Sequence, residues 1–311
     1  MKITNKFNLP DTIMRAALIM NERYDKGNVE RSVTQLIQPP RIDILRKAHF
    51  HEVEKDLSEE WWSLFGNAVH YILELGKSPD MIAEQRLYAE IDGWPISGKP
   101  DLIERHADNL YSLGDYKVTT SYQLTKDEGG LKSEWEQQLN MLACLFAMNH
   151  QATFKELYII AIVRDWQRKQ AQADLTYPAA PVVKIVAPIW TFAQQKAFLE
   201  ERVRQHRNAE MLQDLGLPLP DCSPYERWSR ADRYAVIRHG GKRAARVYDN
   251  EEEAEADAKT RSTSKSMYEV EYRPGKSVRC AGNYCQCAEW CDQFARMRQE
   301  EWQDDETNSE Q

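Results

Sequence analysis

The spacing of apolar residues predicts a helical N-terminal region. From Glu59 to Leu75 they recur every three or four positions, at Trp62, Phe65, Val69 and Ile72, which is typical of a helix with one buried face. His70 lies off this stripe, with Gly66 and Glu74 one turn away on either side. Residues 1–76 as a whole are expected to be helical, with Ser32 or Thr34 as a candidate cap.

The pattern changes to extended runs after residue 83. The segments Glu84 to Ile91 and Trp94 to Glu104 flank Asp92-Gly93, a pair of residues that favours a hairpin turn. A polar turn at residues 106–109 leads into a third run, Leu110 to Val118. These runs predict an antiparallel meander, with Glu84 at its start as a candidate supporting acid.

Helical and extended patterns alternate in the next hundred residues. Ser133 and Glu136 have the spacing of a capping box that opens a helix to about Met148. Two strand-like runs follow at 157–163 and 182–189, and then an amphipathic helix at about 192–212. This order predicts an α/β fold, with a mixed central sheet flanked by helices.

Beyond Gly216 the composition shifts, and prolines break the chain. Short strands are expected at 234–238, 243–248 and 268–272, with an acidic helix at about 250–261. The predicted division is therefore a helical N-terminal region (1–76), a core (77–213), a C-terminal cysteine-containing subdomain (214–297) and an acidic tail (298–311).

Charge at first argues against a nucleic-acid partner, because the net charge is −8 and phosphate binding depends on lysine and arginine. Two acidic segments, 250–257 and 298–311, contribute −5 each, so the remainder carries +2. Candidate contacts to nucleic acid are Arg164 and Trp166, the basic residues of helix 192–212 (Arg202, Arg204 and Arg207), and the arginines of 227–246. Solvated surface explains most of these equally well.

The apolar content of 42% is enough for a sizeable core. The longest apolar run, Leu157 to Val163, is far shorter than a membrane span, and the N-terminus lacks the apolar region of a secretory signal. We expect a soluble, cytoplasmic protein without a membrane partner.

Two carboxylates and a lysine form the first chemical constellation. Asp101 is expected within one strand, and Asp115-Tyr116-Lys117 at the end of the next. If these strands pair, both carboxylates converge, and Lys117 projects from the same strand face as Asp115. Carboxylate oxygens suit Mg²⁺ or Mn²⁺, and a lysine beside them can hold a water molecule. An ordinary hairpin with surface charges is the alternative.

The pattern Pro100-Asp101, thirteen residues, then Asp115-Tyr116-Lys117 resembles the signature of PD-(D/E)XK nucleases, with a restriction-endonuclease-like core. The upstream GNAVH (Gly66 to His70) and the downstream EWEQQLNMLA (Glu134 to Ala143) resemble the RecB-type exonuclease branch. The resemblance implies His70, Asp101, Asp115 and the Tyr116 carbonyl as metal ligands, Lys117 as the catalytic lysine and Gln138 as the motif glutamine. The usual tyrosine of that motif is replaced by Leu142.

Cysteines form the second constellation. Cys280, Cys285, Cys287 and Cys291 lie within twelve residues of one another, a clustering that favours a metal site in a chain without a secretory signal. AddB-like and CRISPR-associated relatives bind a [4Fe–4S] cluster, which implies Cys222, Cys280, Cys285 and Cys291 as ligands and a metal-stapled C-terminal segment. A local Zn²⁺ site that includes Cys287 is the alternative. Cys144 is expected in the core.

The resulting expectation is a metal-dependent DNA exonuclease, similar in style to phage-encoded members. It could act on single- or double-stranded DNA, as a homo-oligomer or with a recombination or replication protein as partner. The alternatives are a structure- or sequence-specific endonuclease and a catalytically silent nucleic-acid-binding protein.

Overall fold

The computed structural model describes residues 2–22, 27–76, 78–83, 85–126 and 128–299. Glu84 and most of the predicted acidic tail lie outside these residues. The chain divides into two compact units. The first comprises Met1–Asp43 and Phe50–Pro218, and the second comprises Ile44–His49 with the described residues from Leu219 onward.

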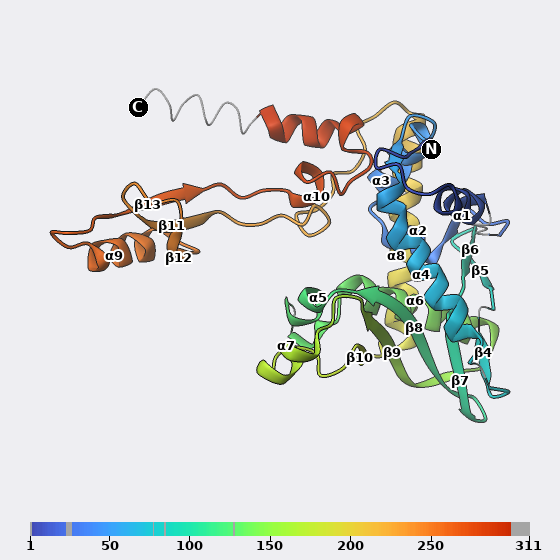
Figure 1. Cartoon of the computed structure of the whole chain (residues 1–311). Helices are drawn as coiled ribbons and strands as arrows, with labels where there is room; N and C mark the ends of the chain where they lie inside the picture. The colour runs from blue at the N-terminus through green and yellow to red at the C-terminus, as the bar shows by residue number, and fades with distance from the viewer. Residues whose placement is uncertain (1, 23–26, 77, 84, 127, 300–311) are drawn as a thin grey trace. The chain divides into compact units, whose positions relative to one another are not determined.

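The first unit is built on a five-stranded sheet with the strand order β10-β9-β8-β7-β4 (Figure 1). Its strands are β4 (Met81–Ala83), β7 (Leu102–Ala107), β8 (Leu110–Thr119), β9 (Thr153–Val163) and β10 (Val182–Ala187). Strand β8 pairs antiparallel with β7 and parallel with β9, so the sheet is mixed. The parallel pair needs a crossover, which carries α5 (Ser121–Lys126), the 3₁₀ turn η1 (Glu128–Gly130) and α6 (Ser133–Asn149).

Two smaller sheets complete the strands of this unit. One has the order β2-β6-β5, from β2 (Arg31–Ser32), β5 (Leu87–Ile91) and β6 (Trp94–Gly98), and the other pairs β1 (Lys2–Thr4) with β3 (Glu54–Asp56). The hairpin turn is confirmed, since Asp92 and Gly93 both have positive φ, 48° and 77°. The single run from Trp94 to Glu104 was wrong. It breaks at Lys99-Pro100 into β6 and β7, which belong to different sheets, and proline cannot donate to a ladder.

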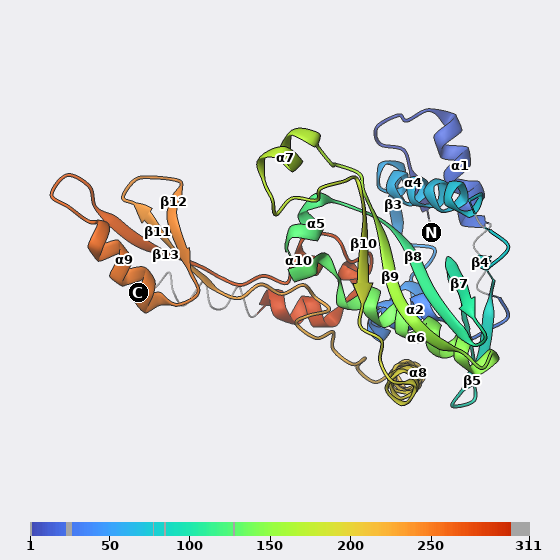
Figure 2. The ribbon, with the colours of Figure 1, turned by 90° about the horizontal axis from the view of Figure 1, so that it is seen from below.

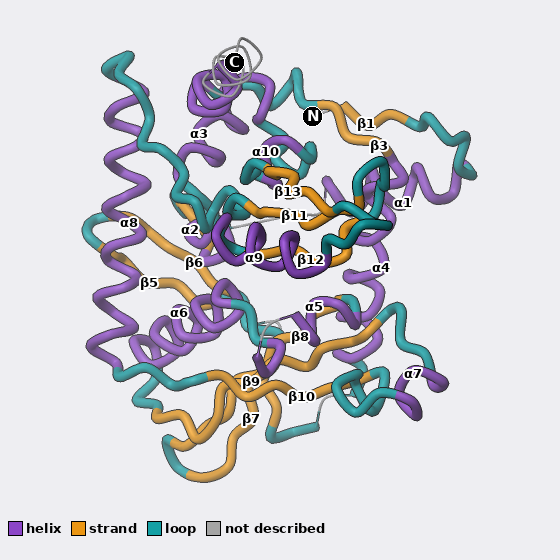
Figure 3. Tube along the Cα trace, turned by 90° about the vertical axis from the view of Figure 1, so that its left-hand side faces the viewer, coloured by secondary structure: helices purple, strands orange, loops and turns teal. Residues whose placement is uncertain are grey.

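The remaining helices of the first unit are α1 (Asp11–Glu22), α2 (Val33–Ile37), α4 (Leu57–Glu74), α7 (Arg168–Ala173) and α8 (Phe192–Asp214), with the start of α3 (Pro40–Ala48). Helices α4 and α6 lie on opposite sides of β8 (Figure 2). Helix α8 runs beside α2 and α6 (Figure 3). Leu139 and Leu142 of α6 are buried with Leu113 of β8 and Ile159 of β9, and Cys144 belongs to this core as expected.

Helix caps follow the sequence only in part. Ser32 caps α2 in a capping box with Gln35. The box expected from Ser133 and Glu136 does not form, because α6 begins one residue earlier than that pattern requires. Lys132 occupies the cap position, and the Ser133 hydroxyl accepts a hydrogen bond from Gln137 instead.

The predicted buried stripe of α4 was also wrong. Trp62 is 48% exposed and Ile72 63% exposed, whereas Phe65 and Val69 are half-buried. The helix packs against α1 and β8, and His70, which lies off the stripe, hydrogen-bonds to the main chain of β8. The spacing therefore identified the helix but not the side that faces the sheet.

The second unit contains a three-stranded antiparallel sheet, in the order β12-β11-β13. Its strands are β11 (Arg233–Arg238), β12 (Ala244–Tyr248) and β13 (Tyr268–Arg273), and α9 (Glu251–Arg261) buries Ala254 and Ala258 against Val236. The cysteine segment carries α10 (Val278–Ala281), the 3₁₀ turn η2 (Ala288–Trp290) and a helical stretch at 292–299. His49 stacks on Trp290 with 4.5 Å between ring centroids.

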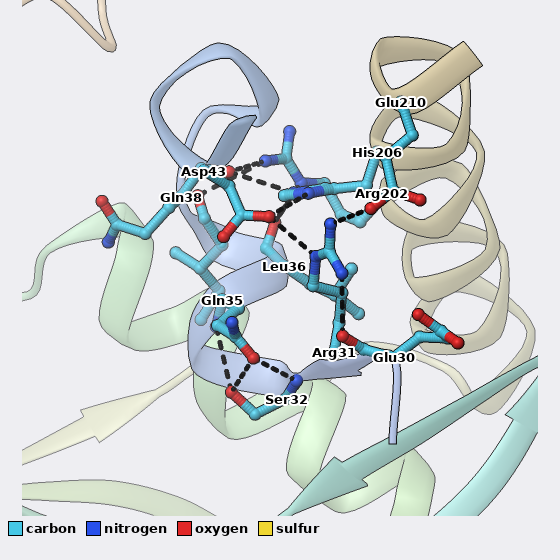
Figure 4. A network of polar contacts seen from close by, with 11 residues as sticks. Glu30, Arg31, Ser32, Gln35, Leu36, Gln38, Asp43, Arg202, His206 and Glu210 are labelled. Carbon is cyan, nitrogen blue, oxygen red and sulfur yellow. Dashed lines mark hydrogen bonds and ion pairs between the residues drawn. The ribbon is translucent and has the colours of Figure 1, made fainter. Parts of the chain in front are cut away.

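A buried polar network joins α2, α3 and α8 within the first unit (Figure 4). Arg31 Nε lies 2.7 Å from Asp43 Oδ2, and both side chains are almost completely buried. Arg31 also pairs with Glu210. From α8, Arg202 donates to the carbonyl oxygens of Leu36 and Gln38, each at 2.7 Å. These contacts fix α8 against the start of the chain.

We expect Asp43→Ala to lower the free energy of unfolding by about 3–5 kcal/mol, because it removes one partner of a buried ion pair. Urea unfolding monitored by circular dichroism would measure the loss. Glu201→Ala is the control, since its exposed pair with Arg204 should contribute less than about 1 kcal/mol. Equal effects of the two variants would contradict this prediction.

His206 should make the fold sensitive to acid. Burial, together with the positive charge of Arg202, lowers the pKa of His206 from 6.5 to about 4. Below about pH 6.5 the unfolded chain therefore binds a proton that the folded protein does not, and stability is lost by a few kcal/mol as the pH falls toward 4. Urea unfolding at about pH 7 and pH 5 should show a smaller loss for His206→Gln than for the wild type.

Among the described residues, no helix is both long and apolar enough to cross a membrane.

Candidate active site

The candidate site forms where β8 extends beyond the end of its antiparallel neighbour β7. Strand β7 begins at Leu102, opposite Gly114, so residues 115–119 of β8 have no partner on that side. Asp101 therefore precedes β7 rather than lying within a strand, which corrects its expected place. Its carboxylate accepts a hydrogen bond from the Tyr116 amide at 2.8 Å. The main chain of β8 is thus open to side chains at this point.

Helix α4 brings His70 to the same edge. One ring nitrogen, Nε2, lies 3.0 Å from the carbonyl oxygen of Tyr116, and the other, Nδ1, lies 3.3 Å from Asp101 Oδ1. Burial alone would lower the pKa of His70, but the hydrogen bond and the negative charge of Asp101, aided by Asp115, raise it above its ordinary value. His70, Asp101 and the Tyr116 carbonyl therefore meet at one point.

Asp115 and Lys117 lie two residues apart on β8, so their side chains share one face of the strand, and Gln138 of α6 bonds to both. Lys117 Nζ is 2.6 Å from Asp115 Oδ2 and donates to Gln138 Oε1 at 3.0 Å. The Gln138 amide donates to Asp115 Oδ1, also at 3.0 Å. The adjacent Gln137 donates to the Ser133 hydroxyl instead. Gln138 thus holds both the carboxylate and the ammonium in place.

Asp115 is in an environment that disfavours a bare negative charge. Burial raises its pKa to about 6, and the nearby Asp101 carboxylate adds to the increase, although Lys117 opposes it. A cation beside both carboxylates would relieve this repulsion. Two carboxylates, an imidazole and a carbonyl are also the donor set that Mg²⁺ or Mn²⁺ accepts.

In the structure, His70 contacts Asp101 and the Tyr116 carbonyl, whereas Asp115 contacts Gln138 and Lys117. Within the part of the chain that it describes, no three His, Cys, Asp or Glu side chains have the spacing of a metal site. The donor chemistry of His70, Asp101, Asp115 and the Tyr116 carbonyl nevertheless fits a divalent ion.

The C-terminal thiols gather within the second unit. Burial raises the pKa of Cys280, and the nearby Cys285 and Cys291 raise it further. A hydrogen bond with Cys287 lowers the pKa of Cys285 to about 6, and the same bond raises that of Cys287. Cys287 is completely buried, so this cysteine, named only in the alternative zinc site, lies in the cluster.

Cys222 is tied to the helical stretch that follows Cys291. The Cys222 amide donates to Gln293 Oε1, and the Gln293 amide donates to the Cys222 carbonyl, each at 2.9 Å. Soft thiolates crowded together suit Zn²⁺ or an iron–sulfur cluster. The donor chemistry of cysteine fits such a group, whereas no three of the described thiols lie at the spacing of a metal site.

The basic residues of α8 are engaged within the protein. Arg202 binds main-chain carbonyls, Arg204 pairs with Glu201, and Arg207 donates to the Asp92 carbonyl at 2.6 Å. Arg164 is different, because its guanidinium stacks on Trp62 at the end of β9. The sequence gave no sign of this pair, since the spacing of α4 placed Trp62 on a buried face.

The mixed sheet between helices, with an acidic pair and a lysine at the end of a central strand, defines the class as a nuclease core that typically uses divalent metal. A family model described as "PD-(D/E)XK nuclease superfamily" matches residues 19–292. The chain belongs to the PD-(D/E)XK nuclease superfamily.

The chain is also similar to a protein of known structure, at low sequence identity. A solved structure described as "Crystal structure of SSO0001" has 18% sequence identity and a TM-score of 0.43, over 62% of this chain and 84% of that one. No curated protein matches the sequence.

Proposed function

We propose that this protein is a Mg²⁺- or Mn²⁺-dependent deoxyribonuclease that degrades DNA from its ends. The observation that carries the proposal is that His70, Asp101 and the Tyr116 carbonyl meet at the edge of β8, next to the Asp115–Lys117 pair. The chain order of these groups, followed by Gln138, supports the RecB-type exonuclease branch. A cytoplasmic setting, a phage origin and the four-part division of the chain belong to the same proposal and rest on the sequence.

The residues of the site would have different roles in phosphodiester hydrolysis. His70, Asp101, Asp115 and the Tyr116 carbonyl would hold the metal, which when bound polarises the scissile phosphate and lowers the pKa of an attacking water. Lys117 would orient or deprotonate that water and offset developing negative charge. Gln138 bonds to both Lys117 and Asp115, so it holds the Lys117 ammonium beside the Asp115 carboxylate.

The cysteine site is proposed to be structural. Cys222, Cys280, Cys285 and Cys291 would hold a [4Fe–4S] cluster, with a local Zn²⁺ site that includes Cys287 as the alternative. Either group would fasten the segment around Cys222 to the segment around Cys291, which Gln293 already links.

The test is cleavage of end-labelled linear DNA and of a covalently closed circle, each with Mg²⁺, Mn²⁺ or EDTA. We expect metal-dependent release of short products from linear DNA and little cutting of the circle. Cleavage in EDTA would overturn the metal mechanism. If the circle is cut as fast as linear DNA, the protein is an endonuclease and the exonuclease proposal is wrong.

A further inference from the structure

Trp62 and Arg164 form a stacked pair at the end of the catalytic strands. The Arg164 guanidinium carbon lies 3.6 Å from the centroid of the Trp62 ring. Phe65 meets the same ring edge-on, at 6.3 Å and 85°. Stacking of this kind holds the indole in one orientation. The pair is therefore ordered without a partner molecule.

Both members remain accessible. Trp62 is 48% exposed although it contacts two other side chains, and Arg164 is exposed. No carboxylate of the described residues forms an ion pair with Arg164, since the adjacent Asp165 accepts hydrogen bonds from Ser121 instead. The pair thus offers an exposed aromatic ring beside a guanidinium that pairs with none of the described carboxylates.

The pair also lies on the two elements that frame the candidate site. Trp62 precedes His70 by eight residues on α4, which is about 12 Å along the helix axis and about 80° around it. Arg164 directly follows β9, and its amide donates to the carbonyl of Thr119, two residues beyond Lys117 on β8. A strand of nucleic acid that passes the metal ligands can therefore reach the pair within a few nucleotides.

We propose that Trp62 and Arg164 form a subsite for single-stranded DNA within a few nucleotides of the scissile phosphate. The indole stacks on an unpaired base, and the guanidinium binds the adjacent phosphate. Bases in a duplex are already stacked on their neighbours, so the pair selects an unpaired strand. This inference rests on the proposed nuclease function and specifies which form of DNA occupies the site.

The test compares Trp62→Ala with Trp61→Ala. Trp61 is the adjacent residue, is similarly exposed at 43%, and projects about 100° away around the helix. Binding of fluorescein-labelled oligothymidine and of a labelled blunt duplex is measured by anisotropy in EDTA, which stops metal-dependent cleavage. Trp62→Ala should weaken oligothymidine binding by at least about fivefold, whereas Trp61→Ala should not.

Arg164→Gln supplies a second, independent measurement. Loss of one phosphate contact should reduce the slope of log affinity against log salt by about 0.7 for the single strand. The matched control is Arg168→Gln, an exposed arginine of α7, which should leave the slope unchanged. In Mg²⁺, Trp62→Ala should raise KM for single-stranded DNA far more than it lowers kcat.

The outcomes separate this inference from the proposed function. If the wild type cleaves DNA but Trp62→Ala binds oligothymidine as Trp61→Ala does, the subsite is overturned and the nuclease stands. Equal weakening on the blunt duplex would also overturn it, because stacking on an unpaired base cannot act there. If the wild type binds oligothymidine through Trp62 but never cleaves, the subsite stands and the nuclease function falls.

Discussion

Asp115→Asn should reduce metal-dependent DNA cleavage by about 10²- to 10⁴-fold. The substitution keeps the size of a side chain that is 2% exposed but removes the charge that faces Lys117 and the proposed metal. Because burial disfavours the charged carboxylate more than Lys117 favours it, the uncharged amide should let the variant fold at least as stably as the wild type. Initial rates on end-labelled DNA in Mg²⁺ would measure the loss.

Asp108→Asn is the matched control for this experiment. Asp108 lies on the turn between β7 and β8, in the same hairpin, and its side chain is 98% exposed. Its replacement should leave the rate unchanged. Lys117→Met should also lose most of its cleavage activity. Loss of activity in two different variants makes misfolding of one of them an insufficient explanation. Cleavage by Asp115→Asn at the rate of Asp108→Asn would refute the assigned site.

Cys285→Ser should abolish iron or zinc binding and loosen the second unit. Ligation energy of this kind is also folding energy, on the order of 10 kcal/mol for structural zinc, so its loss is comparable to the whole stability of a small domain. We expect the purified wild type to contain iron or zinc by elemental analysis, and the variant to lose it. Limited proteolysis should then cleave the variant beyond residue 218 while the first unit persists.

Cys144→Ala is the control, because Cys144 is buried in the core of the first unit and has no role in the cysteine site. It should retain the metal. Comparison of Cys222→Ser with Cys287→Ser identifies the fourth ligand: the variant that loses the metal marks the ligand. Wild-type protein free of iron and zinc would refute the site.

Local patterns predicted most elements of the first unit. The Asp92-Gly93 turn, the helix at 133–149 and the strand that carries Asp115 all depend on short-range chemistry, namely turn residues, apolar periodicity and β propensity. The break between β6 and β7 was missed although Pro100 stands there, because each half of the run is extended and only sheet pairing distinguishes them.

The approach of Asp101 to Asp115 was predictable, because a short hairpin links them, whereas the roles of His70, the Tyr116 carbonyl and Gln138 came only from the resemblance to the nuclease family. What could not be read was the contact between elements distant in the chain. Gln138 rather than Gln137 meets Lys117, since the rotation of α6 is set by the burial of Leu139 and Leu142. The inclusion of Cys287 among the clustered thiols likewise depends on the path of the chain between Cys285 and Cys291.

The sequence by itself determined the order of the chemical groups and the strands and helices that carry them, because these follow from neighbours along the chain. The tertiary structure decided which side of each element faces the site. Helix α4 shows the reason. Its apolar spacing marks Trp62 and Ile72 for burial, but packing against α1 and β8 turns His70 inward and leaves Trp62 beside Arg164. This orientation of α4 minimises the free energy of the whole packed unit rather than of the helix alone.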